Sequence, residues 1–511
     1  MRMQPQFTLQ QLLMSLVPAD QIQDVAELMV TGICLDSRKV EPGDLFFART
    51  GVQHKGIEFV EAAASNGAVA AIVSREELAG VDCNRSSMPV IGVEDIDGLI
   101  GRVASRFYGE PSRQLKMIGI TGTNGKTSCS HYVAQALESA GETSALIGTV
   151  GNGLLGRLEA ATHTTPDAIS LQALLAELLA KGATAVVMEV SSHALDQQRV
   201  AGVEFDVAGF TNLSRDHLDY HGDMNSYGAA KAQLFTAMDV PYLVINRDDS
   251  FGEKLVEQIA KQPLLKPLVL ESSQRPRCFS FGEQPDADIV AWQITLSTDG
   301  ICAQIDTPWG TLGLKTGLIG RFNLSNLLLT IGVIGQLGLS REEIETAVNG
   351  ITAVPGRMQI VMHSRPLVVV DYAHTPDALE KALLALNSHC NGRLWCVFGC
   401  GGDRDTGKRP EMGAIAAHLA DSVVVTSDNP RSEDPERIIA MIMAGIESDA
   451  EVTSISNREQ AIEHATAALA ENDILLIAGK GHETYQEVKG VRMPFDDVEI
   501  ARQALAQRAV G

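Results

Sequence analysis

Short apolar runs alternate with helix-like segments along most of this chain, and this alternation is the strongest constraint on its fold. Beyond residue 112 the strand-like runs are Met117–Ile120, Ala185–Val190, Val207–Leu213, Tyr242–Asn246, Leu367–Asp371, Leu394–Phe398, Ser422–Thr426 and Ile474–Ala478. Strands that alternate with helices form mostly parallel sheets covered on both faces. Ligands of such sheets bind at the carboxyl ends of the strands, so the polar turns that follow these runs are the first candidates for a site.

The length predicts several domains, because 511 residues exceed what one compact core accommodates. We expect three α/β domains: a small one at 1–111, a central P-loop-type domain with a mostly parallel sheet at 112–353, and a Rossmann-like, doubly wound one at 354–511. In the first domain, short strands are expected at Ile33–Leu35, Leu45–Ala48, Ala70–Val73 and Val90–Val93. Before them, the apolar residues between Phe7 and Val17 follow a helical stripe.

Composition narrows the classes of partner. With 41 basic and 64 acidic residues the net charge is −23, which repels nucleic acid and anionic membranes. No apolar stretch reaches the roughly 20 residues that span a bilayer, and the N-terminus does not resemble a secretion signal. The eight scattered cysteines are typical of reduced thiols. We expect a cytoplasmic protein without nucleic-acid binding, membrane insertion or an obligate protein partner.

The first strand of the central segment leads into a glycine-containing turn that predicts a phosphate site. This turn is Gly122-Thr123-Asn124-Gly125-Lys126-Thr127. Glycines let backbone N–H groups approach phosphate oxygens, Lys126 would contact the β- and γ-phosphates of ATP, and the Thr127 hydroxyl would join the shell of Mg²⁺. The common phosphate-loop pattern has a further glycine where this chain has Ile120. An ordinary strand–turn–helix turn is the alternative.

Glu189 ends an apolar strand beside this loop, which suits an Mg²⁺ ligand. Together, the loop and its flanking elements resemble the Mur ligase family, which includes the folylpolyglutamate synthases. The resemblance implies that ATP activates a carboxylate as an acyl phosphate, which an amine then attacks. It also implies that Glu189 and His217 hold metal ions and that Lys231 is carbamylated and becomes a further ligand. Lys126, Glu189, His217 and Lys231 are the implied catalytic residues.

The family resemblance extends to segments that close over ATP. Asn323, in Gly320-Arg321-Phe322-Asn323, matches a position that helps to bind the nucleotide. Arg357 and Asp371 match C-terminal segments that close over it. Asp371 ends a predicted strand and could accept hydrogen bonds from ribose hydroxyls, or it could simply cap the next helix.

Asp428-Asn429-Pro430-Arg431 follows another strand of the last segment. Asp428 and Asn429 supply acceptors for an ammonium group, Pro430 stiffens the turn, and Arg431 has the planar fork that suits a carboxylate. From these residues alone, a polar strand-to-helix loop is the favoured interpretation. The run resembles the signature of the Mur ligases that add meso-diaminopimelate. By resemblance, Arg404 and Arg431 hold the carboxylates of this amino acid, whereas Asp428, Asn429 and Glu483 meet its amino groups near Gly479.

The first segment resembles the region of the family that holds a uridine diphosphate moiety, through Leu35 and Ser37 and, more loosely, Gln53 and His54. In the central segment, the positions that match contacts to the sugar–peptide substrate are Thr164, Thr165, Ser191, Gln197 and Arg199. For each of these residues, a purely local hydrogen bond is the alternative.

The whole resemblance implies a ligase that joins meso-diaminopimelate to UDP-N-acetylmuramoyl-L-alanyl-D-glutamate, with Mg²⁺ as cofactor and ATP as co-substrate. The same reaction with L-lysine and a folate-polyglutamylating ligase are the rival enzymes. A nucleotide-dependent switch protein without catalysis is the rival from another class. The switch would retain the phosphate loop but would have no use for Glu189, His217, Lys231 and the Asp428–Arg431 run together.

Overall fold

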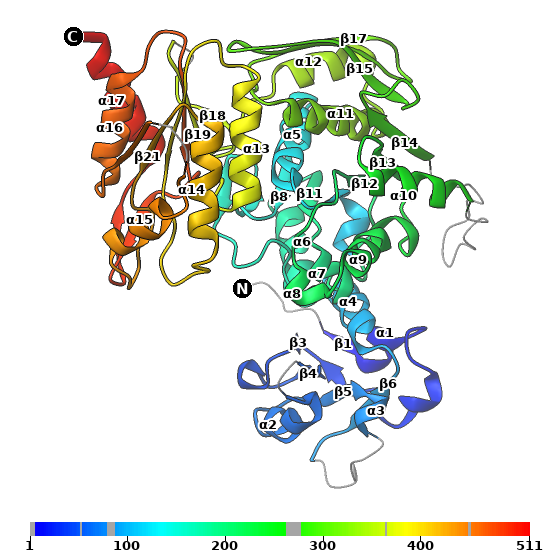
Figure 1. The fold of residues 1–511 in the computed structure, drawn as a ribbon. Coiled ribbons are helices and arrows are strands. Elements are labelled where there is room, and N and C mark those ends of the chain that lie inside the picture. The colour runs from blue at the N-terminus through cyan, green and yellow to red at the C-terminus, as the bar shows by residue number, and fades with distance from the viewer. Residues whose placement is uncertain are drawn as a thin grey trace. The chain divides into compact units, whose positions relative to one another are not determined.

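The computed structural model describes residues 6–51, 54–78, 87–261, 277–362, 365–447 and 451–510 (Figure 1). Two compact units make up the chain, Met1–Ser280 and Phe281–Gly511. Within the described ranges, no helix has both the length and the apolar character needed to cross a membrane.

The first unit contains a four-stranded parallel sheet whose strands lie where the sequence predicts strands. Its order is β3 (Gly32–Cys34), β4 (Asp44–Ala48), β5 (Ala70–Ser74) and β6 (Val90–Val93). Alternate residues of β4 point to opposite faces. Leu45 and Phe47 pack in one core with α4 (Ile96–Phe107), whereas Phe46 and Ala48 pack in another with α2 (Val60–Ser65). The short helix α3 (Arg75–Leu78) follows β5.

The predicted N-terminal helical stripe is only partly correct. Helix α1 covers Leu9–Leu13, and Phe7 lies instead in β1 (Phe7–Thr8), which pairs with β2 (Met29–Val30). The Thr8 side chain accepts a hydrogen bond from the Gln11 backbone and fixes the helix start. Ser15, with φ 63°, takes the left-handed conformation that cannot continue a helix.

The central sheet of the first unit has the order β10-β9-β8-β11-β7-β12-β13. Strands β8, β11, β7, β12 and β13 are parallel, whereas β9 and β10 add an antiparallel edge. The strands are β7 (Lys116–Thr121), β8 (Ser144–Ile147), β9 (Asn152–Leu154), β10 (Arg157–Glu159), β11 (Ala185–Glu189), β12 (Val207–Phe210) and β13 (Tyr242–Asn246). The helices are α5 (Lys126–Ser139), α6 (Ala168–Ala180), α7 (Ser192–Asp196), α8 (Leu218–His221), α9 (Met224–Thr236) and α10 (Ser250–Lys261). Because β7 lies between β11 and β12, the turns that follow these three strands meet at one sheet edge.

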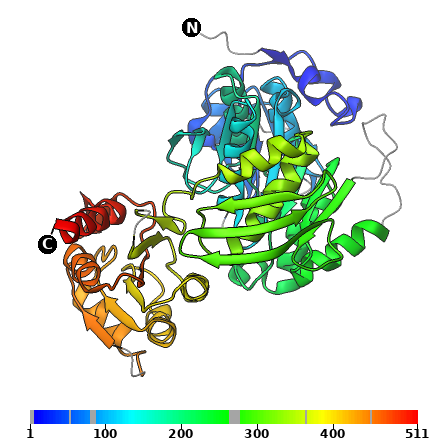
Figure 2. The ribbon, with the colours of Figure 1, turned by 90° about the horizontal axis from the view of Figure 1, so that it is seen from above.

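The second unit begins with a smaller, mainly antiparallel group of strands. Strand β14 (Arg277–Gly282) crosses the unit boundary, and β15 (Ile289–Ser297), β16 (Gly300–Asp306) and β17 (Leu312–Thr316) follow. Strand β16 is antiparallel to both of its neighbours. Helix α11 (Arg321–Gln336) contacts β15, and α12 (Arg341–Asn349) contacts β17. Figure 2 shows the yellow-green helical segment beside the green strands.

The rest of the second unit is the predicted doubly wound domain. Its sheet order is β18-β19-β23-β20-β21-β22, parallel except for β18. Helices α13, α14 and α15 pack on one face, and α16 and α17 on the other (Figure 1). The strands are β18 (Gln359–Ile360), β19 (Leu367–Asp371), β20 (Leu394–Phe398), β21 (Ser422–Val425), β22 (Glu451–Ser454) and β23 (Ile474–Ala478), followed by the hairpin β24 (Tyr485–Val488) and β25 (Val491–Pro494). The helices are α13 (Pro376–Asn387), α14 (Lys408–Leu419), α15 (Pro435–Met443), α16 (Arg458–Ala468) and α17 (Asp497–Val510).

Candidate active site

The phosphate loop lies between β7 and α5, where the sequence predicts it. Gly122 and Gly125 have φ of 146° and 84°, and a Cβ on Gly122 would lie 1.9 Å from Thr211 Oγ1. Both glycines are therefore required by the backbone path. Lys126 is the first residue of α5, and its Nζ donates to the carbonyl oxygens of Gly122 and Thr123 at 2.8 Å each. The Asn124 N–H donates to the Asn212 side chain at 3.0 Å.

Glu189 lies at the end of β11 with its carboxylate buried beside this loop. The Thr127 hydroxyl is 3.0 Å from both carboxylate oxygens. Thr149, which the sequence reasoning missed, donates its N–H at 2.8 Å and its hydroxyl at 3.2 Å. A carboxylate and a hydroxyl are thus adjacent at the helix that follows the phosphate loop, and both are ligand types that Mg²⁺ prefers.

Lys231, on α9, is buried next to the phosphate loop. Its Nζ donates to the Gly122 carbonyl at 2.8 Å, the same oxygen that Lys126 contacts, and lies 4.5 Å from the centre of the Tyr227 ring. Burial first, and then the charge of Lys126, lower the pKa of the Lys231 amine well below its usual value. A neutral amine is the form that reacts with carbon dioxide to give a carbamate.

His217 precedes α8 in a left-handed conformation with φ 52°. Its ring centre lies 6.1 Å from that of Tyr227 and 4.8 Å from that of His193. Tyr227 therefore has His217 and Lys231 as neighbours. In the described part of the chain, no three His, Cys, Asp or Glu side chains are arranged to hold a metal ion. The oxygen pair of Thr127 and Glu189 fits Mg²⁺, whereas Lys231 fits only once a carboxyl group has replaced its ammonium charge.

A pocket in the first unit gathers several residues predicted to contact the sugar–peptide substrate. Leu35, Gln197 and Arg199 line it. The Arg199 guanidinium donates to the Thr165 carbonyl at 2.9 Å and to Gln197 Oε1 at 2.7 and 3.0 Å. The Thr165 hydroxyl lies 3.3 Å from Ser191 Oγ. The pocket lining that sequence reasoning missed consists of Arg49, Asp97, Ile100, His163, Asp167 and Ala168.

The other described residues predicted to contact the sugar–peptide substrate do not line this pocket. Thr164 lies 3.2 Å from Thr149, one of the donors to Glu189. Ser37 is buried, and its carbonyl accepts from Asn66 at 2.8 Å. His54 packs edge-on against Phe59 and is not among the pocket residues, and Gln53 lies outside the described residues.

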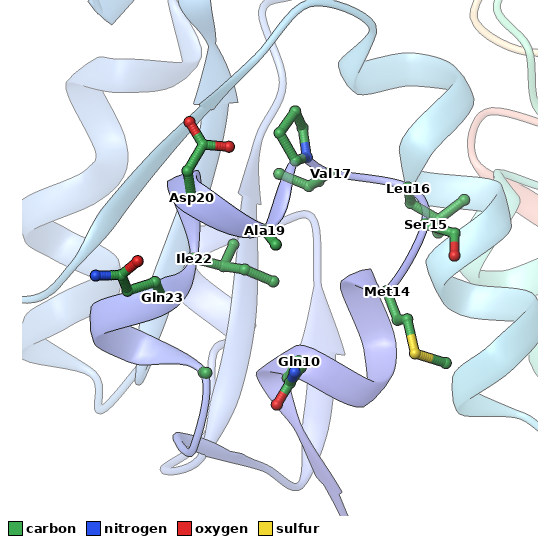
Figure 3. A pocket seen from close by; sticks show the side chains of 11 residues that line it. Gln10, Met14, Ser15, Leu16, Val17, Ala19, Asp20, Ile22 and Gln23 are labelled. Carbon is green, nitrogen blue, oxygen red and sulfur yellow. The ribbon is translucent and has the colours of Figure 1, made fainter.

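A second hollow occurs near α1 and contains none of the predicted site residues. It is lined by Gln10, Met14–Asp20, Ile22, Gln23 and Ala26, which Figure 3 shows around the turn after α1. Only a few of these side chains are polar. The hollow does not contribute to the candidate active site.

Three neighbouring strands of the second unit, β21, β20 and β23, end at the predicted amino-acid site. Asp428 and Asn429 are buried there, and Asn429 Nδ2 donates to Glu483 Oε2 at 2.7 Å. A Cβ on Gly479 would lie 2.5 Å from Asp428 Oδ2, so only glycine fits there. Burial raises the pKa of the Asp428 carboxyl, against the opposing charges of Arg458 and Lys480.

The two predicted carboxylate-binding arginines flank one glycine. A Cβ on Gly401 would lie 2.9 Å from Arg431 Nη1 and 3.9 Å from Arg404 Cγ. Arg431 has φ 51°, directly after Pro430, and its guanidinium donates to the Gly402 carbonyl at 2.8 Å. The structure therefore brings Arg404, Asp428, Asn429, Pro430, Arg431, Gly479 and Glu483 to one group of strand ends.

The segments predicted to close over ATP lie in the same unit. Asn323, near the start of α11, is buried and donates to the Ile319 carbonyl at 2.7 Å. The Arg357 guanidinium carbon lies 4.9 Å from the centre of the Tyr372 ring, and Arg357 Nε is buried without a hydrogen-bond partner among the described residues. Burial raises the pKa of Asp371, which accepts from the Met358 N–H at 2.7 Å.

A phosphate loop beside a buried carboxylate, with a second sheet that gathers guanidinium and carboxylate groups, defines a multidomain enzyme that uses a nucleoside triphosphate. More narrowly, the chain belongs to the Mur ligase family and is an ATP-dependent, ADP-forming ligase. Residues 120–334 match the Mur ligase middle domain, 356–481 the glutamate ligase domain and 29–108 the Mur ligase family catalytic domain. These matches confirm the three-part α/β fold and the family resemblance.

Several relatives of similar length carry the same name. The UDP-N-acetylmuramoyl-L-alanyl-D-glutamate–2,6-diaminopimelate ligase of Ectopseudomonas mendocina is 48% identical over 96% of this chain and 98% of its own length. The ligase of that name from Coxiella burnetii is 45% identical over 94% and 96%. A solved structure of a ligase with the same name has a TM-score of 0.76 at 36% identity, covering 98% of this chain and 99% of that chain. The MurF structure from Acinetobacter baumannii, with 20% identity and a TM-score of 0.59 over 93% and 96%, shares the fold.

Proposed function

We propose that this ligase joins meso-diaminopimelate to UDP-N-acetylmuramoyl-L-alanyl-D-glutamate, with release of ADP and phosphate, in the synthesis of a peptidoglycan precursor. The observation that carries the proposal is the gathering of Arg404, Arg431, Asp428, Asn429 and Glu483 at the ends of β20, β21 and β23. The names of the similar ligases support the same choice. Since ATP is the co-substrate, the proposal includes a cytoplasmic location.

At the nucleotide, the backbone N–H groups of the phosphate loop and Lys126 would hold the phosphates of ATP. Thr127 and Glu189 would hold Mg²⁺, with His217 and the carbamate of Lys231 as the further ligands that we propose. A bound Mg²⁺ supplies charge stabilisation during transfer of the γ-phosphoryl group. Asn323, Arg357 and Asp371 are the further nucleotide-binding residues that we propose.

The environment of Lys231 supports carbamylation. As an ammonium, its side chain would be repelled by Lys126, which shares the Gly122 carbonyl with it. As a carbamate it would carry a negative charge, and the same neighbour would attract it. Carbamylation would thus remove an unfavourable contact and create a metal ligand in one step.

At the acceptor end, Arg199 is half-buried, and its guanidinium is already fixed by Gln197 and the Thr165 carbonyl. A fixed cation suits the phosphates or carboxylates of the anionic substrate. Leu35, Ser37, Thr164 and Ser191, with the looser candidates Gln53 and His54, complete the proposed contacts. The D-glutamate side-chain carboxylate would receive the phosphoryl group and then react with the incoming amine.

At the amino-acid end, Arg404 and Arg431 would hold the carboxylates of meso-diaminopimelate, and Asp428, Asn429 and Glu483 its amino groups. L-Lysine lacks the second carboxylate and would leave a desolvated guanidinium unpaired. Such missing-partner discrimination reaches about 10⁴-fold.

The deciding experiment measures phosphate release from Mg²⁺-ATP with UDP-N-acetylmuramoyl-L-alanyl-D-glutamate, comparing meso-diaminopimelate with L-lysine. Release that depends on meso-diaminopimelate, with a product of the tripeptide mass, supports the proposal. Release with L-lysine alone would retain the ligase but refute its proposed amino-acid specificity. No release with either amino acid would refute the proposed substrates.

A further inference from the structure

Lys480 is a fully buried lysine that no step of the proposed reaction uses. It follows β23 and Gly479, and none of its side chain is exposed. A buried ammonium group is costly unless it is paired and hydrogen-bonded. Its partners therefore indicate what this side chain does.

The Lys480 ammonium contacts two members of the proposed amino-acid site. Its Nζ donates to Asn429 Oδ1 and to Glu483 Oε2 at 3.3 Å each, and lies 5.6 Å from the centre of the Tyr485 ring. Asn429 Oδ1 also accepts from the Glu487 N–H at 2.9 Å. Two donors thus fix the oxygen side of the Asn429 amide, and its nitrogen side must face Glu483.

This arrangement uses one oxygen of each site carboxylate. Glu483 Oε2 accepts from both Lys480 and Asn429, and Asp428 Oδ1 accepts from the Asn429 N–H at 2.7 Å. Across the described residues, no donor is bonded to Glu483 Oε1 or to Asp428 Oδ2. Two carboxylate oxygens are therefore left for an ammonium group from outside.

The charges around these oxygens lead to the same conclusion. Arg458 pairs with Asp497 at 2.7 Å, and both side chains are completely buried. Arg458, Lys480, Glu483 and Asp497 all act on the Asp428 carboxyl. Arg458 pairs with Asp497 and Lys480 pairs with Glu483, so Asp428 has no ion-pair partner of its own among the described residues. The ammonium group of an amino-acid substrate would supply that partner.

We propose that Lys480 is a positioning residue for the amino-acid substrate. It fixes the Asn429 amide and the Glu483 carboxylate so that Glu483 Oε1 and Asp428 Oδ2 receive the substrate ammonium group. The inference rests on the proposed function, since it assigns Lys480 to the proposed binding of meso-diaminopimelate. A merely structural role for Lys480 would instead change the KM values for all three substrates or destabilise the folded state.

The test replaces Lys480 by methionine, which has a side chain of similar length but no charge. We expect the KM for meso-diaminopimelate to rise by about tenfold or more, the cost of one weakened charge-assisted contact. The KM values for ATP and for the UDP-muramoyl dipeptide stay at the wild-type values. The matched control is Lys381→Met, because Lys381 is an exposed lysine of the same unit in a surface ion pair with Asp377. This control leaves all three KM values unchanged.

A double-mutant cycle with Glu483→Gln tests whether Lys480 acts through Glu483. We expect Lys480→Met to raise the KM for meso-diaminopimelate much less in the Glu483→Gln background than in the wild type. If Lys480→Met does not fold, Lys480→Gln, which keeps donors without charge, takes its place with the same expectation.

The outcomes separate the inference from the proposed function. A wild-type KM for meso-diaminopimelate in the Lys480 variant, or independent effects in the cycle, overturns the positioning role alone. Equal losses for all three substrates indicate a structural role and also overturn it. Wild-type protein without activity on meso-diaminopimelate refutes the proposed function, and the inference fails with it.

Discussion

Replacing Gly479 by alanine would place a methyl group 2.5 Å from Oδ2 of Asp428. This distance is shorter than real Cβ contacts, so the carboxylate must move. It is one of the two oxygens that we assign to the substrate ammonium group. The same glycine has φ 115°, a conformation that L-residues rarely adopt.

Two effects of different kind follow from these numbers. The positive φ costs an alanine about 1–2 kcal/mol in stability. Displacement of the Asp428 carboxylate removes a charge-assisted hydrogen bond to the substrate, which is worth about 1.5–3 kcal/mol. At about 1.4 kcal/mol per factor of ten, kcat/KM for meso-diaminopimelate should fall about 10- to 150-fold. The KM for ATP should not change.

The assay is phosphate release at varied meso-diaminopimelate concentration, together with urea unfolding. Gly490→Ala is the matched control, because Gly490 also has a positive φ, 77°, but no atom lies within 4 Å of its added Cβ. The control should lose a similar amount of stability without losing kcat/KM. If Gly479→Ala keeps the wild-type kcat/KM, or if both variants lose it equally, Asp428 does not bind the substrate as we propose.

Three further predictions concern buried groups. In bicarbonate buffer, intact-mass and peptide analysis without acid treatment should show that Lys231 gains the mass of one carboxyl group. Burial and Lys126 lower the pKa of its amine, so only more acidic buffers should reprotonate the amine and reduce the modified fraction. Absence of the added mass throughout would refute carbamylation. Arg458→Met should lower the free energy of unfolding, measured in urea, by about 3–5 kcal/mol because it leaves buried Asp497 unpaired. Adding Asp497→Leu should restore most of the lost stability, and a double variant no more stable than Arg458→Met would contradict the pairing. Thr127→Val should reduce kcat in the phosphate-release assay by about tenfold or more, since the hydroxyl beside Glu189 is lost. Thr127→Ser keeps the hydroxyl and should retain most of the rate. Equal losses of kcat in the two variants would indicate that the methyl group of Thr127, not its hydroxyl, is important.

The sequence predicted the parts of the site that follow apolar strands. Both the phosphate loop and the Asp428–Arg431 run come directly after such strands, and parallel pairing brings neighbouring strand ends to one edge. The phosphate loop was predictable even with Ile120 at the missing glycine position. Ile120 lies inside β7, and the glycines that need positive φ are Gly122 and Gly125.

Contacts between distant segments were not predictable. Lys480 resembles any other lysine of a glycine-rich turn, and its burial depends on Asn429 and Glu483 being folded around it. Thr149 donates to Glu189 across 40 residues of sequence. The N-terminal helix was predicted too long because the apolar period continues past Met14, whereas the backbone leaves the helical conformation at Met14, with ψ 128°, and is left-handed at Ser15.

The buried pair of Arg458 and Asp497 also implies an order in which the parts of the site form during synthesis. Arg458 donates to the carbonyls of Ser427 and Ala478, the residues that lead into the two substrate loops. Its counter-charge is on Asp497, the first residue of α17. A ribosome that has not yet released Asp497 from its exit tunnel therefore holds a chain whose phosphate loop can already fold. In that chain the amino-acid site still lacks the Asp497 carboxylate, which neutralises the buried Arg458. The phosphate loop should thus fold before the amino-acid site as the chain emerges.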